Sequence, residues 1–265
     1  MGDGYGDSVR VVTWNVNSLK MRMPRVLEFI EVHHPDVLLL QETKAPQDAF
    51  PDLELAEAGY HAVHHSAGQW AGVAVLARTD LPLEDPALSL PGDPVSNEAR
   101  WCEATVDGIR MASVYVPNGR TLDSPEYPRK LAFLDAMAAR ITELQSQNVP
   151  VIVAGDMNIA PADADVYDPP AFAGGTHVSA AERNRLGAIL DGGMVDAYRA
   201  VHPDEVQYTW WDYRAGHFHK GFGLRIDLAL VSAPLAERLV ACGIDRNFRK
   251  GKKPSDHAPL MLELN

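Results

Sequence analysis

Polar side chains that can bind a metal ion or a phosphate stand at the ends of several apolar stretches of the chain. These stretches are VVTWNVNS with Asn15 and Asn17, VLLLQETK with Glu42, VYVPNG with Tyr115 and Asn118, VIVAGDMN with Asp156 and Asn158, RIDLALV with Asp227, and SDHAPL with Asp256 and His257. In an extended chain residues i and i+2 point the same way, so Asn15 with Asn17, and Asp156 with Asn158, can each address one ligand. Carboxylate and amide oxygens suit a hard divalent cation. The pattern therefore predicts an oxygen-rich centre.

Asp227 is informative because it lies inside an apolar run. A carboxylate there is costly unless a cation or a hydrogen-bond donor faces it. His257 is one candidate partner, since a carboxylate on one ring nitrogen leaves the other free for a phosphate oxygen or an attacking water. The alternative partner is the neighbouring Arg225, which would make Asp227 part of a structural ion pair.

The residue types favour magnesium over zinc. Glu42 and Asp256 are candidate ligands, because Mg²⁺ takes a few carboxylates and keeps several waters. The sequence contains no HExxH motif, and the spacing of its histidines does not indicate a helix-borne zinc pair. A Walker A loop and a GxGxxG motif are also absent, so the phosphate cradles of nucleotide-triphosphate and dinucleotide sites are missing.

The charge is unevenly distributed. With 24 basic and 36 acidic residues the net charge is −12, which argues against binding nucleic acid through bulk charge alone. Residues 246–253 (RNFRKGKK) nevertheless hold five basic residues and no acidic one. This segment is either a solvated loop or a local patch that faces phosphates. The aromatic segment QYTWWDYR, with Trp210, Trp211 and Tyr213, is likewise either core packing or a stacking surface.

Short apolar and β-branched runs predict ten strands, and amphipathic patterns predict about four helices. The strands are expected at 9–16, 36–42, 61–65, 72–77, 101–106, 109–116, 149–154, 207–213, 224–231 and 258–264. Helices are expected to begin near Pro24, to carry a stripe from Leu131 to Ile141, to follow a capping box at Ser179 and Glu182, and to begin at Pro234. The excess of strands favours two packed sheets with outer helices over strict βαβ alternation.

The remainder of the chain predicts one domain at 9–265 after a disordered, Gly-rich tail at 1–8. Apolar runs are far shorter than the ~20 residues of a membrane span, and the first residues carry no signal-peptide pattern. Two cysteines, Cys102 and Cys242, are too few for a disulfide framework. We therefore expect a soluble, cytoplasmic protein without a membrane partner, and by default a monomer.

Taken together, the motifs WNVNSL, LLLQETK, VYVPNG, VIVAGDMNIA, YTWWDYR, GLRIDLALVS and SDHAPL resemble the exonuclease III family of DNA-repair nucleases. This family includes AP endonucleases and lies within the endonuclease/exonuclease/phosphatase superfamily. The resemblance runs from about Val9 to the C-terminus. It implies an α/β fold of two packed, mainly antiparallel sheets flanked by helices, a four-layered sandwich like that of deoxyribonuclease I.

The resemblance also implies roles for individual residues. Glu42 would bind the divalent metal, with support from Asn15, Asp156, Asn158, Asp227 and Asp256. Asp156 would activate the attacking water. Asn158 and Asn118 would position water or phosphate, Tyr115 would contact the phosphate or leaving group, and His257, oriented by Asp227, would donate to the phosphoryl oxygens. Trp210, Leu224 and Ile226 would line a pocket for a base-free sugar. Independently of the resemblance, the basic segment 246–253, with Arg249, Lys250, Lys252 and Lys253, is the candidate rim for phosphates.

The resulting hypothesis is a Mg²⁺-dependent phosphodiesterase, with Mn²⁺ as a possible substitute, that acts on double-stranded DNA. It would incise 5′ to abasic sites and remove nucleotides or blocking groups from 3′ ends. One alternative is a superfamily phosphatase or phosphodiesterase that acts on a lipid head group or small molecule. Another is a noncatalytic DNA-damage binder with the same fold, although a pure binder gains nothing from a buried acid such as Asp227.

Overall fold

Twelve strands form two six-stranded sheets in residues 8–265, the part of the chain that this computed structural model describes. The strands are β1 (Val9–Asn15), β2 (Val37–Gln41), β3 (Tyr60–His65), β4 (Val73–Arg78), β5 (Glu84–Ala87), β6 (Trp101–Val106), β7 (Ile109–Tyr115), β8 (Val151–Asp156), β9 (Met194–Asp196), β10 (Asp227–Ser232), β11 (Leu239–Ile244) and β12 (Leu260–Leu264). The first sheet has the order β11-β12-β1-β2-β4-β3, and the second has the order β5-β6-β7-β8-β10-β9. Only the β1–β2 and β7–β8 pairs among these strands are parallel.

The same part of the chain contains eight α-helices and several short 3₁₀ turns. The helices are α1 (Leu19–His33), α2 (Asp52–Glu57), α3 (Glu126–Ser146), α4 (Pro169–Phe172), α5 (Ala180–Asp191), α6 (Ala197–Val201), α7 (His217–Lys220) and α8 (Ala233–Ala236). Within residues 8–265, none of them combines the length and the hydropathy that a bilayer crossing requires.

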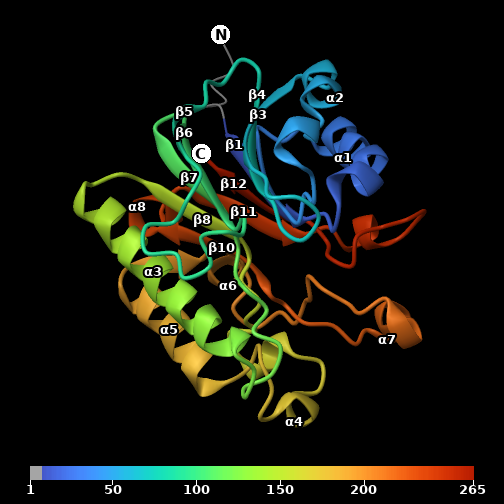
Figure 1. Cartoon of the computed structure of the whole chain (residues 1–265), viewed down its shortest axis with the longest axis vertical. Coiled ribbons are helices and arrows are strands. Elements are labelled where there is room, and N and C mark those ends of the chain that lie inside the picture. Colours follow the sequence, from blue (N-terminus) through green and yellow to red (C-terminus); the bar gives the residue numbers. More distant parts are fainter. Residues whose placement is uncertain (1–7) are drawn as a thin grey trace.

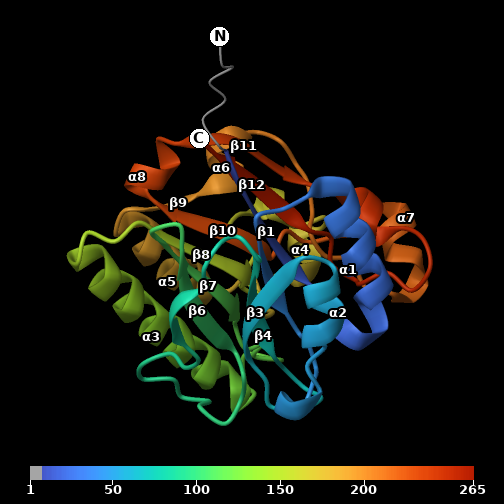
Figure 2. The same ribbon diagram turned by 90° about the horizontal axis from the view of Figure 1, so that it is seen from above.

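Four layers result from the alternation of side chains along the strands. One face of each strand fills the space between the sheets, with buried residues such as Leu39 and Met111. The opposite face of the first sheet packs on α1 and α2, and that of the second sheet packs on α3 and α5. Figures 1 and 2 show these two helix layers on opposite sides of the paired sheets. The predicted four-layered sandwich of mainly antiparallel sheets is thus confirmed.

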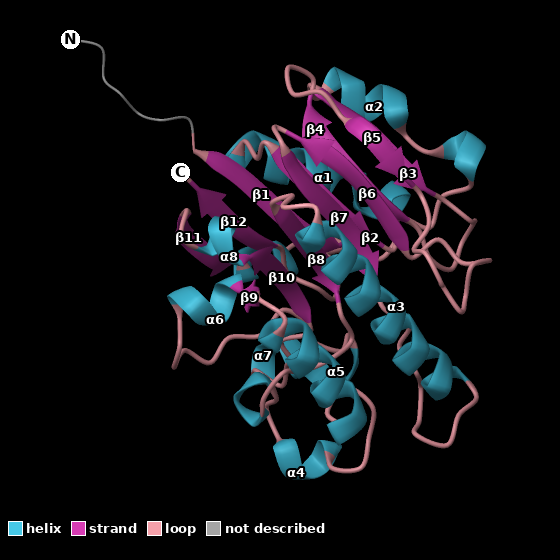
Figure 3. Ribbon diagram, turned by 90° about the vertical axis from the view of Figure 1, so that its left-hand side faces the viewer, coloured by secondary structure: helices cyan, strands magenta, loops and turns pink. Residues whose placement is uncertain are grey.

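Strand direction explains why the polar residues meet. Strands β1, β2, β7 and β8 end at the same rim of the sandwich, where their polar C-terminal residues emerge. Strands β10 and β12 run antiparallel to β8 and β1, so their first residues and the segment just before β12 lie at that same rim. Asp227 is directly opposite Asp156 in the ladder. The central strands and their shared direction are visible in Figure 3.

The strand predictions were wrong in four places. The segment 207–213 is not a strand, since only isolated bridges connect Trp210 to Leu224 and His257. The amides of Thr209 and Trp210 both donate to the carbonyl of Leu224, which breaks the regular ladder. Strands β5, β9 and β11 were missed; β5 and β9 have only four and three residues, and β11 is a sheet-edge strand that carries a register shift.

The helix predictions were partly wrong. The first helix begins at Leu19 rather than near Pro24, which lies inside it. Leu19 is fully buried and its amide donates to Thr43, so tertiary packing determines where this helix begins. The stripe on α3, the Ser179–Glu182 capping box of α5 and the short helix at Pro234 are confirmed. The four other helices, α2, α4, α6 and α7, were missed, because segments this short carry no clear periodicity.

The N-terminal boundary can be compared only in part. Residues 1–7 of the predicted tail lie outside the described residues. Ser8, also assigned to that tail, is exposed, and its hydroxyl donates to Glu263 over 2.8 Å.

Candidate active site

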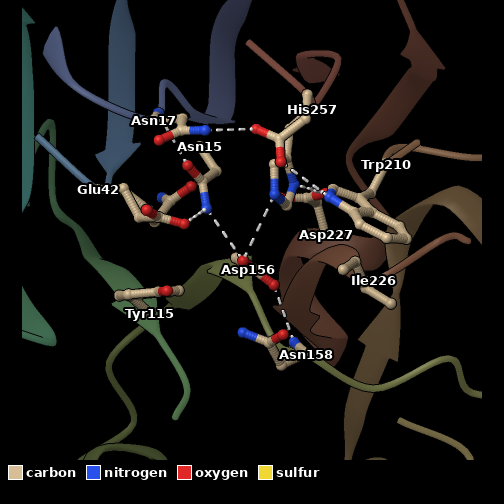
Figure 4. A network of polar contacts seen from close by, with 12 residues as sticks. Asn15, Asn17, Glu42, Tyr115, Asp156, Asn158, Trp210, Ile226, Asp227 and His257 are labelled. Carbon is tan, nitrogen blue, oxygen red and sulfur yellow. Dashed lines mark hydrogen bonds and ion pairs between the residues drawn. The ribbon is translucent and has the colours of Figure 1, made fainter. Parts of the chain in front are cut away.

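The predicted site residues converge on one pocket at the rim where the strands end. A cavity of about 220 Å³ is lined by Glu42, Tyr115, Asn118, Asp156, Asn158, His177, Trp210, Ile226, Asp256 and His257. Asn15 and Asp227 are fully buried immediately behind these residues (Figure 4). All but one of the pocket residues, His177, were proposed from the sequence. Residues separated by more than 200 positions therefore form one site.

Asn15 joins two of the carboxylates. Its side-chain amide donates to Glu42 over 2.8 Å and to Asp156 over 3.0 Å. Asn15 is the last residue of β1, and Glu42 directly follows β2 in the left-handed backbone region, at φ 50°. A non-glycine residue in this region is typical of a site where the surrounding structure holds a side chain in place.

Asp256 is held by two donors on the other side of the pocket. The Asn17 amide donates to its Oδ1 over 2.9 Å, and the Trp210 indole donates to its Oδ2 over 3.1 Å. Burial would raise the pKa of Asp256, but the charge of His257 and these hydrogen bonds outweigh it and lower the pKa. Asp256 is therefore an ionised carboxylate in the site.

Lys44 is a site residue that sequence reasoning missed. Its Nζ lies 2.6 Å from the Glu42 carboxylate and 2.6 Å from Oδ1 of Asn17. The signal was its position two residues after Glu42 in QETK. The ammonium group partly balances the carboxylates at the open side of the site.

His257 is bound by Asp227, as one of the two alternatives predicted. Its Nδ1 donates to Oδ2 of Asp227 over 2.8 Å, and its Nε2 lies 3.8 Å from Oδ2 of Asp156. Burial alone would lower the pKa of His257, but the Asp227 and Asp156 carboxylates outweigh it and raise the pKa to about 10. The ring is therefore a cation whose Nε2–H points toward the pocket.

The alternative prediction, an ion pair between Asp227 and Arg225, was wrong. Arg225 forms ion pairs with Asp165 at 2.7 Å and with Asp196 at 2.8 Å. Arg225 is separated from Asp227 by one residue, and it lies before β10 begins, so the local backbone does not place the two side chains together.

Two groups that line the pocket, the Asp156 carboxyl and the Tyr115 phenol, have raised pKa values. Burial raises the pKa of Asp156 to about 7; His257 opposes this rise, whereas Asp227 and Glu42 add to it. Burial, followed by the charges of Glu42 and Asp156, raises the pKa of Tyr115 well above its ordinary value. Asp156 is thus a stronger base than an exposed aspartate, and Tyr115 remains a hydrogen-bond donor.

The donor set fits a divalent cation. Ligand atoms of Glu42, Asp156 and His257 all lie within 4.8 Å of one another. In addition, Oδ1 of Asp227 is buried without a hydrogen-bond partner among residues 8–265. Burial, to which the charges of Asp227 and Glu42 add, raises the pKa of Asp156. Mg²⁺ prefers oxygen donors, and the protonated His257 ring has no free lone pair, so the carboxylates of Glu42 and Asp156 are the candidate metal ligands of this group.

Asn118 and Asn158 are linked to each other and to a buried ion pair that the sequence analysis missed. The Asn118 side chain donates to the Asn158 side chain over 3.0 Å. Behind them, Lys130 of α3 and Glu182 of α5 are both fully buried and form an ion pair. Lys130 also donates to the backbone carbonyls of Asn158, at 2.7 Å, and Asn118, at 3.2 Å. Its position on the apolar stripe of α3 was the signal that could have revealed it.

His177 is the pocket residue that sequence reasoning missed. It lies in the loop before α5, and its Nδ1 is 2.6 Å from the backbone carbonyl of Asn158. Burial, together with the nearby charge of Lys130, lowers the pKa of His177 to about 4. The imidazole is therefore neutral, in contrast to that of His257.

Trp210 and Ile226 form the apolar wall of the pocket, where both were predicted to lie. Leu224 is buried beneath them, in one cluster with Ala160 and Val166, and does not line the cavity itself. The rest of the aromatic segment divides between environments: Trp211 is buried against Phe218 and Ala258, whereas Tyr213 is 48% exposed. Packing and pocket lining are thus both present in one short segment.

The basic segment 246–253 lies beside the pocket, and its residues differ in exposure. Arg249 is buried; its guanidinium stacks over the rings of Tyr213 and Phe218 and donates to the Trp211 carbonyl. Its predicted contact with phosphate does not fit this position, because the guanidinium is buried against these rings. Lys250, Lys252 and Lys253 are exposed.

Comparisons with known proteins agree with this geometry. Residues 12–257 match the model of the Endonuclease/Exonuclease/phosphatase family. An exodeoxyribonuclease III from Haemophilus influenzae is 31% identical over 271 residues, which cover 97% of this chain and all of that protein. A Neisseria 3′ phosphatase solved with a product DNA hairpin has a TM-score of 0.94 and 38% identity, covering 97% of this chain and 99% of that one. An AP endonuclease from Archaeoglobus fulgidus has a TM-score of 0.93 and 34% identity, with coverage of 97% and 99%.

Proposed function

Because this chain belongs to the exonuclease III and AP endonuclease family of hydrolytic DNA-repair nucleases, we propose that it cleaves phosphodiester bonds in double-stranded DNA with Mg²⁺. The proposed reactions are incision on the 5′ side of abasic sites and removal of nucleotides or blocking groups from 3′ ends. Residues 9–265 would act as one catalytic domain.

The observation that carries this proposal is the meeting of a buried base, a buried cation and a tyrosine donor around one cavity. Asp156 lies 3.8 Å from the His257 ring, and both line the pocket with Tyr115. Hydrolysis of a phosphodiester brings an anionic nucleophile to an anionic substrate, so fixed donors are required where negative charge develops. The site provides such donors opposite a carboxylate.

Asp156 is the proposed acceptor of the proton from the attacking water. Two hydrogen bonds fix the carboxylate. The backbone amide of Asn158 donates to Oδ1 over 2.9 Å, and the side-chain amide of Asn15 donates to Oδ2. With its pKa raised to about 7, Asp156 can take a proton near neutral pH. The water oxygen then bonds to phosphorus as the bond to the 3′ oxygen breaks. The departing oxygen takes a proton from solvent water, which gives a 3′ hydroxyl and a 5′ phosphate.

His257 and Tyr115 are the proposed donors to the phosphoryl oxygens, and Asn118 and Asn158 are proposed to orient the phosphate. Asp227 keeps the His257 ring in one orientation. A bound Mg²⁺ would supply Lewis-acid stabilisation of charge on the phosphate. Glu42 would hold it, with Asn15, Asp156, Asn158 and Asp256 as neighbouring oxygen donors.

The DNA itself is proposed to bind along the rim of the pocket. Trp210 and Ile226 would receive the base-free sugar, and the exposed Lys250, Lys252 and Lys253 would contact phosphates without reading bases. Arg249 would anchor this basic loop through its aromatic contacts. The DNA hairpin bound by the Neisseria relative supports a DNA substrate.

The test uses two labelled duplexes, one with an abasic site and one intact with a recessed 3′ end, each incubated with Mg²⁺ or EDTA. We expect Mg²⁺-dependent cleavage of both, at a rate about 10²–10⁴-fold lower with the D156N variant. Cleavage of neither duplex at any metal concentration would refute the proposal. Hydrolysis of small phosphate esters without cleavage of DNA would instead identify a phosphatase of the superfamily.

A further inference from the structure

Lys130 is a fully buried residue of α3 that lies behind the pocket without lining it. Its Nζ pairs with the carboxylate of Glu182 on the neighbouring helix α5 (Figure 1). The same Nζ donates to the backbone carbonyl of Asn158 over 2.7 Å and to that of Asn118 over 3.2 Å. An ammonium group carries three donors and no acceptor, so it suits a place where several oxygens converge. One buried side chain therefore connects the two asparagines of the pocket.

Charge balance alone does not require these two carbonyl contacts. A second cation of α3, Arg140, lies 2.6 Å from the buried carboxylate of Glu103, and all its hydrogen bonds within residues 8–265 are to carboxylates. Lys130 differs, because it pairs with Glu182 and also holds backbone atoms of the loops that follow β7 and β8. These additional contacts are to site residues, which indicates a role beyond compensation of the buried carboxylate.

The backbone at both contacts has a conformation that must be held in place. Asn158 has φ 50°, in the left-handed region that costs energy for most residues other than glycine. On the other side, Gly119 has φ 83°, and a Cβ at this position would lie 2.9 Å from Cδ of Lys130. Because Gly119 has no side chain, the loop approaches Lys130 closely, and the Asn118 carbonyl comes within reach of the ammonium.

Displacement of these carbonyls would move the polar groups that line the pocket. The Asn118 side-chain amide donates to Oδ1 of Asn158 over 3.0 Å, so the two side chains are coupled. The backbone amide of Asn158 also donates to Oδ1 of Asp156 over 2.9 Å (Figure 4). A misplacement of ~1 Å in such groups can cost about 10²-fold in rate. The contacts of Lys130 can therefore affect catalysis from outside the pocket.

We propose that Lys130 is a positioning residue that holds Asn118 and Asn158 in the orientation in which their amides bind the scissile phosphate. This inference rests on the proposed function, in which these two asparagines orient the phosphate. Lys130 does not touch the substrate, since it lies outside the lining of the cavity. It acts on the chemical step through the two backbone carbonyls, and Glu182 compensates its buried charge.

The test measures kcat and KM for nucleotide release from the duplex with a recessed 3′ end in Mg²⁺. We expect K130M to lower kcat about 10- to 100-fold and to change KM less than about threefold, because the exposed residues proposed to bind DNA are unaltered. R140M is the matched control on the same helix. It weakens the compensation of buried Glu103, so it should lose stability toward urea and keep kcat within about twofold.

A double-mutant cycle separates positioning from a general effect on the fold. In N118A/N158G, where glycine suits the left-handed backbone at position 158, the side chains that Lys130 positions are absent. Adding K130M should then lower the single-turnover rate by less than about threefold, whereas independent effects multiply. Enzyme in excess of DNA keeps these slow rates measurable.

The remaining outcomes are distinct. A near-normal kcat in K130M, an equal loss in R140M, or a full further loss on the N118A/N158G background would overturn the role of Lys130. Absence of cleavage by the unmodified enzyme would instead refute the proposed function. Should K130M fail to fold, as judged by circular dichroism, K130M/E182Q provides the same test, because it removes both buried charges and glutamine suits the capping box of α5.

Discussion

Two clusters of buried charge lie close together in this molecule and differ in their balance. In the first, Arg225 and Arg199 face Asp165 and Asp196, so two cations match two acids. Both oxygens of Asp165 also have hydrogen-bond partners. This cluster is complete without any further group.

The active-site cluster is not balanced. It contains four carboxylates, those of Glu42, Asp156, Asp227 and Asp256, against two cations, Lys44 and His257. Two negative charges remain, and Oδ1 of Asp227 has no partner among the described residues. Buried charge is costly unless it is compensated. The comparison indicates two roles for buried acids in this fold. Acids whose charge is matched by arginine stabilise the structure, whereas acids with excess negative charge are placed to bind a cationic ligand.

Exchanging one aspartate for asparagine in each cluster should have opposite effects. We expect D156N to lower kcat for abasic-site cleavage by about 10²–10⁴-fold, the usual contribution of a positioned base. Its thermal stability should be unchanged or higher, because a buried and uncompensated charge is removed. D196N is the matched control, and it should lose stability while it retains its rate. A D156N variant with a near-normal rate would remove Asp156 from catalysis.

Removing the central cation of the balanced cluster should destabilise the fold. We expect R225M to lower the free energy of unfolding by about 3–5 kcal/mol, since it removes the cation that Asp196 faces and leaves Asp165 with Arg199 alone. Urea unfolding measures this loss, and kcat should change by less than about tenfold. A stable R225M would show that the cluster is not needed for stability, and a selective loss of kcat would show that it supports catalysis.

Binding of Mg²⁺ should also stabilise the unbalanced cluster. With Mg²⁺ at about 100 times its dissociation constant, binding contributes about 2.7 kcal/mol and should raise the melting temperature by on the order of 5 °C. EDTA should reverse the shift, and R225M should retain it. E42Q should lose most of it, because a proposed ligand is altered. An equal shift in E42Q would place the ion elsewhere.

The fold class and most of the pocket could be predicted from the sequence, because buried strands have a strong signature. Each of these strands ends where an apolar run is followed by an acidic residue, Glu42 after β2 and Asp156 at the end of β8. The ends of these strands lie together at one rim of the two sheets. The prediction failed for 207–213, although its aromatic residues favour a strand. Trp210, Trp211 and Tyr213 lie in three environments, which a single local pattern does not describe.

The missed site residues depend on contacts between distant segments. In the sequence, Lys130 is a single polar residue on an apolar helical stripe. Only the structure shows that the carboxylate of Glu182 compensates its buried charge. His177 lies in a loop, two residues after Gly175, and no spacing connects it with Asn158. Similarly, the choice between His257 and Arg225 as the partner of Asp227 required the geometry of the β10 region. Periodicity predicts elements, whereas such pairings are determined by packing.

The smallest expected effect concerns Lys44, the cation that reduces the imbalance of the active site. Its ammonium lies 2.6 Å from the Glu42 carboxylate and would repel a divalent ion bound there. K44M raises the excess negative charge by one, so we expect Mg²⁺ to bind about three- to tenfold more tightly, roughly 1 kcal/mol, since solvent screens this partly exposed pair. Titration calorimetry without DNA measures the affinity, and K20M, on the exposed face of α1, is the control. Unchanged or weaker binding in K44M would mean that Lys44 holds Glu42 in position for the metal, and charge balance alone would then not explain the site.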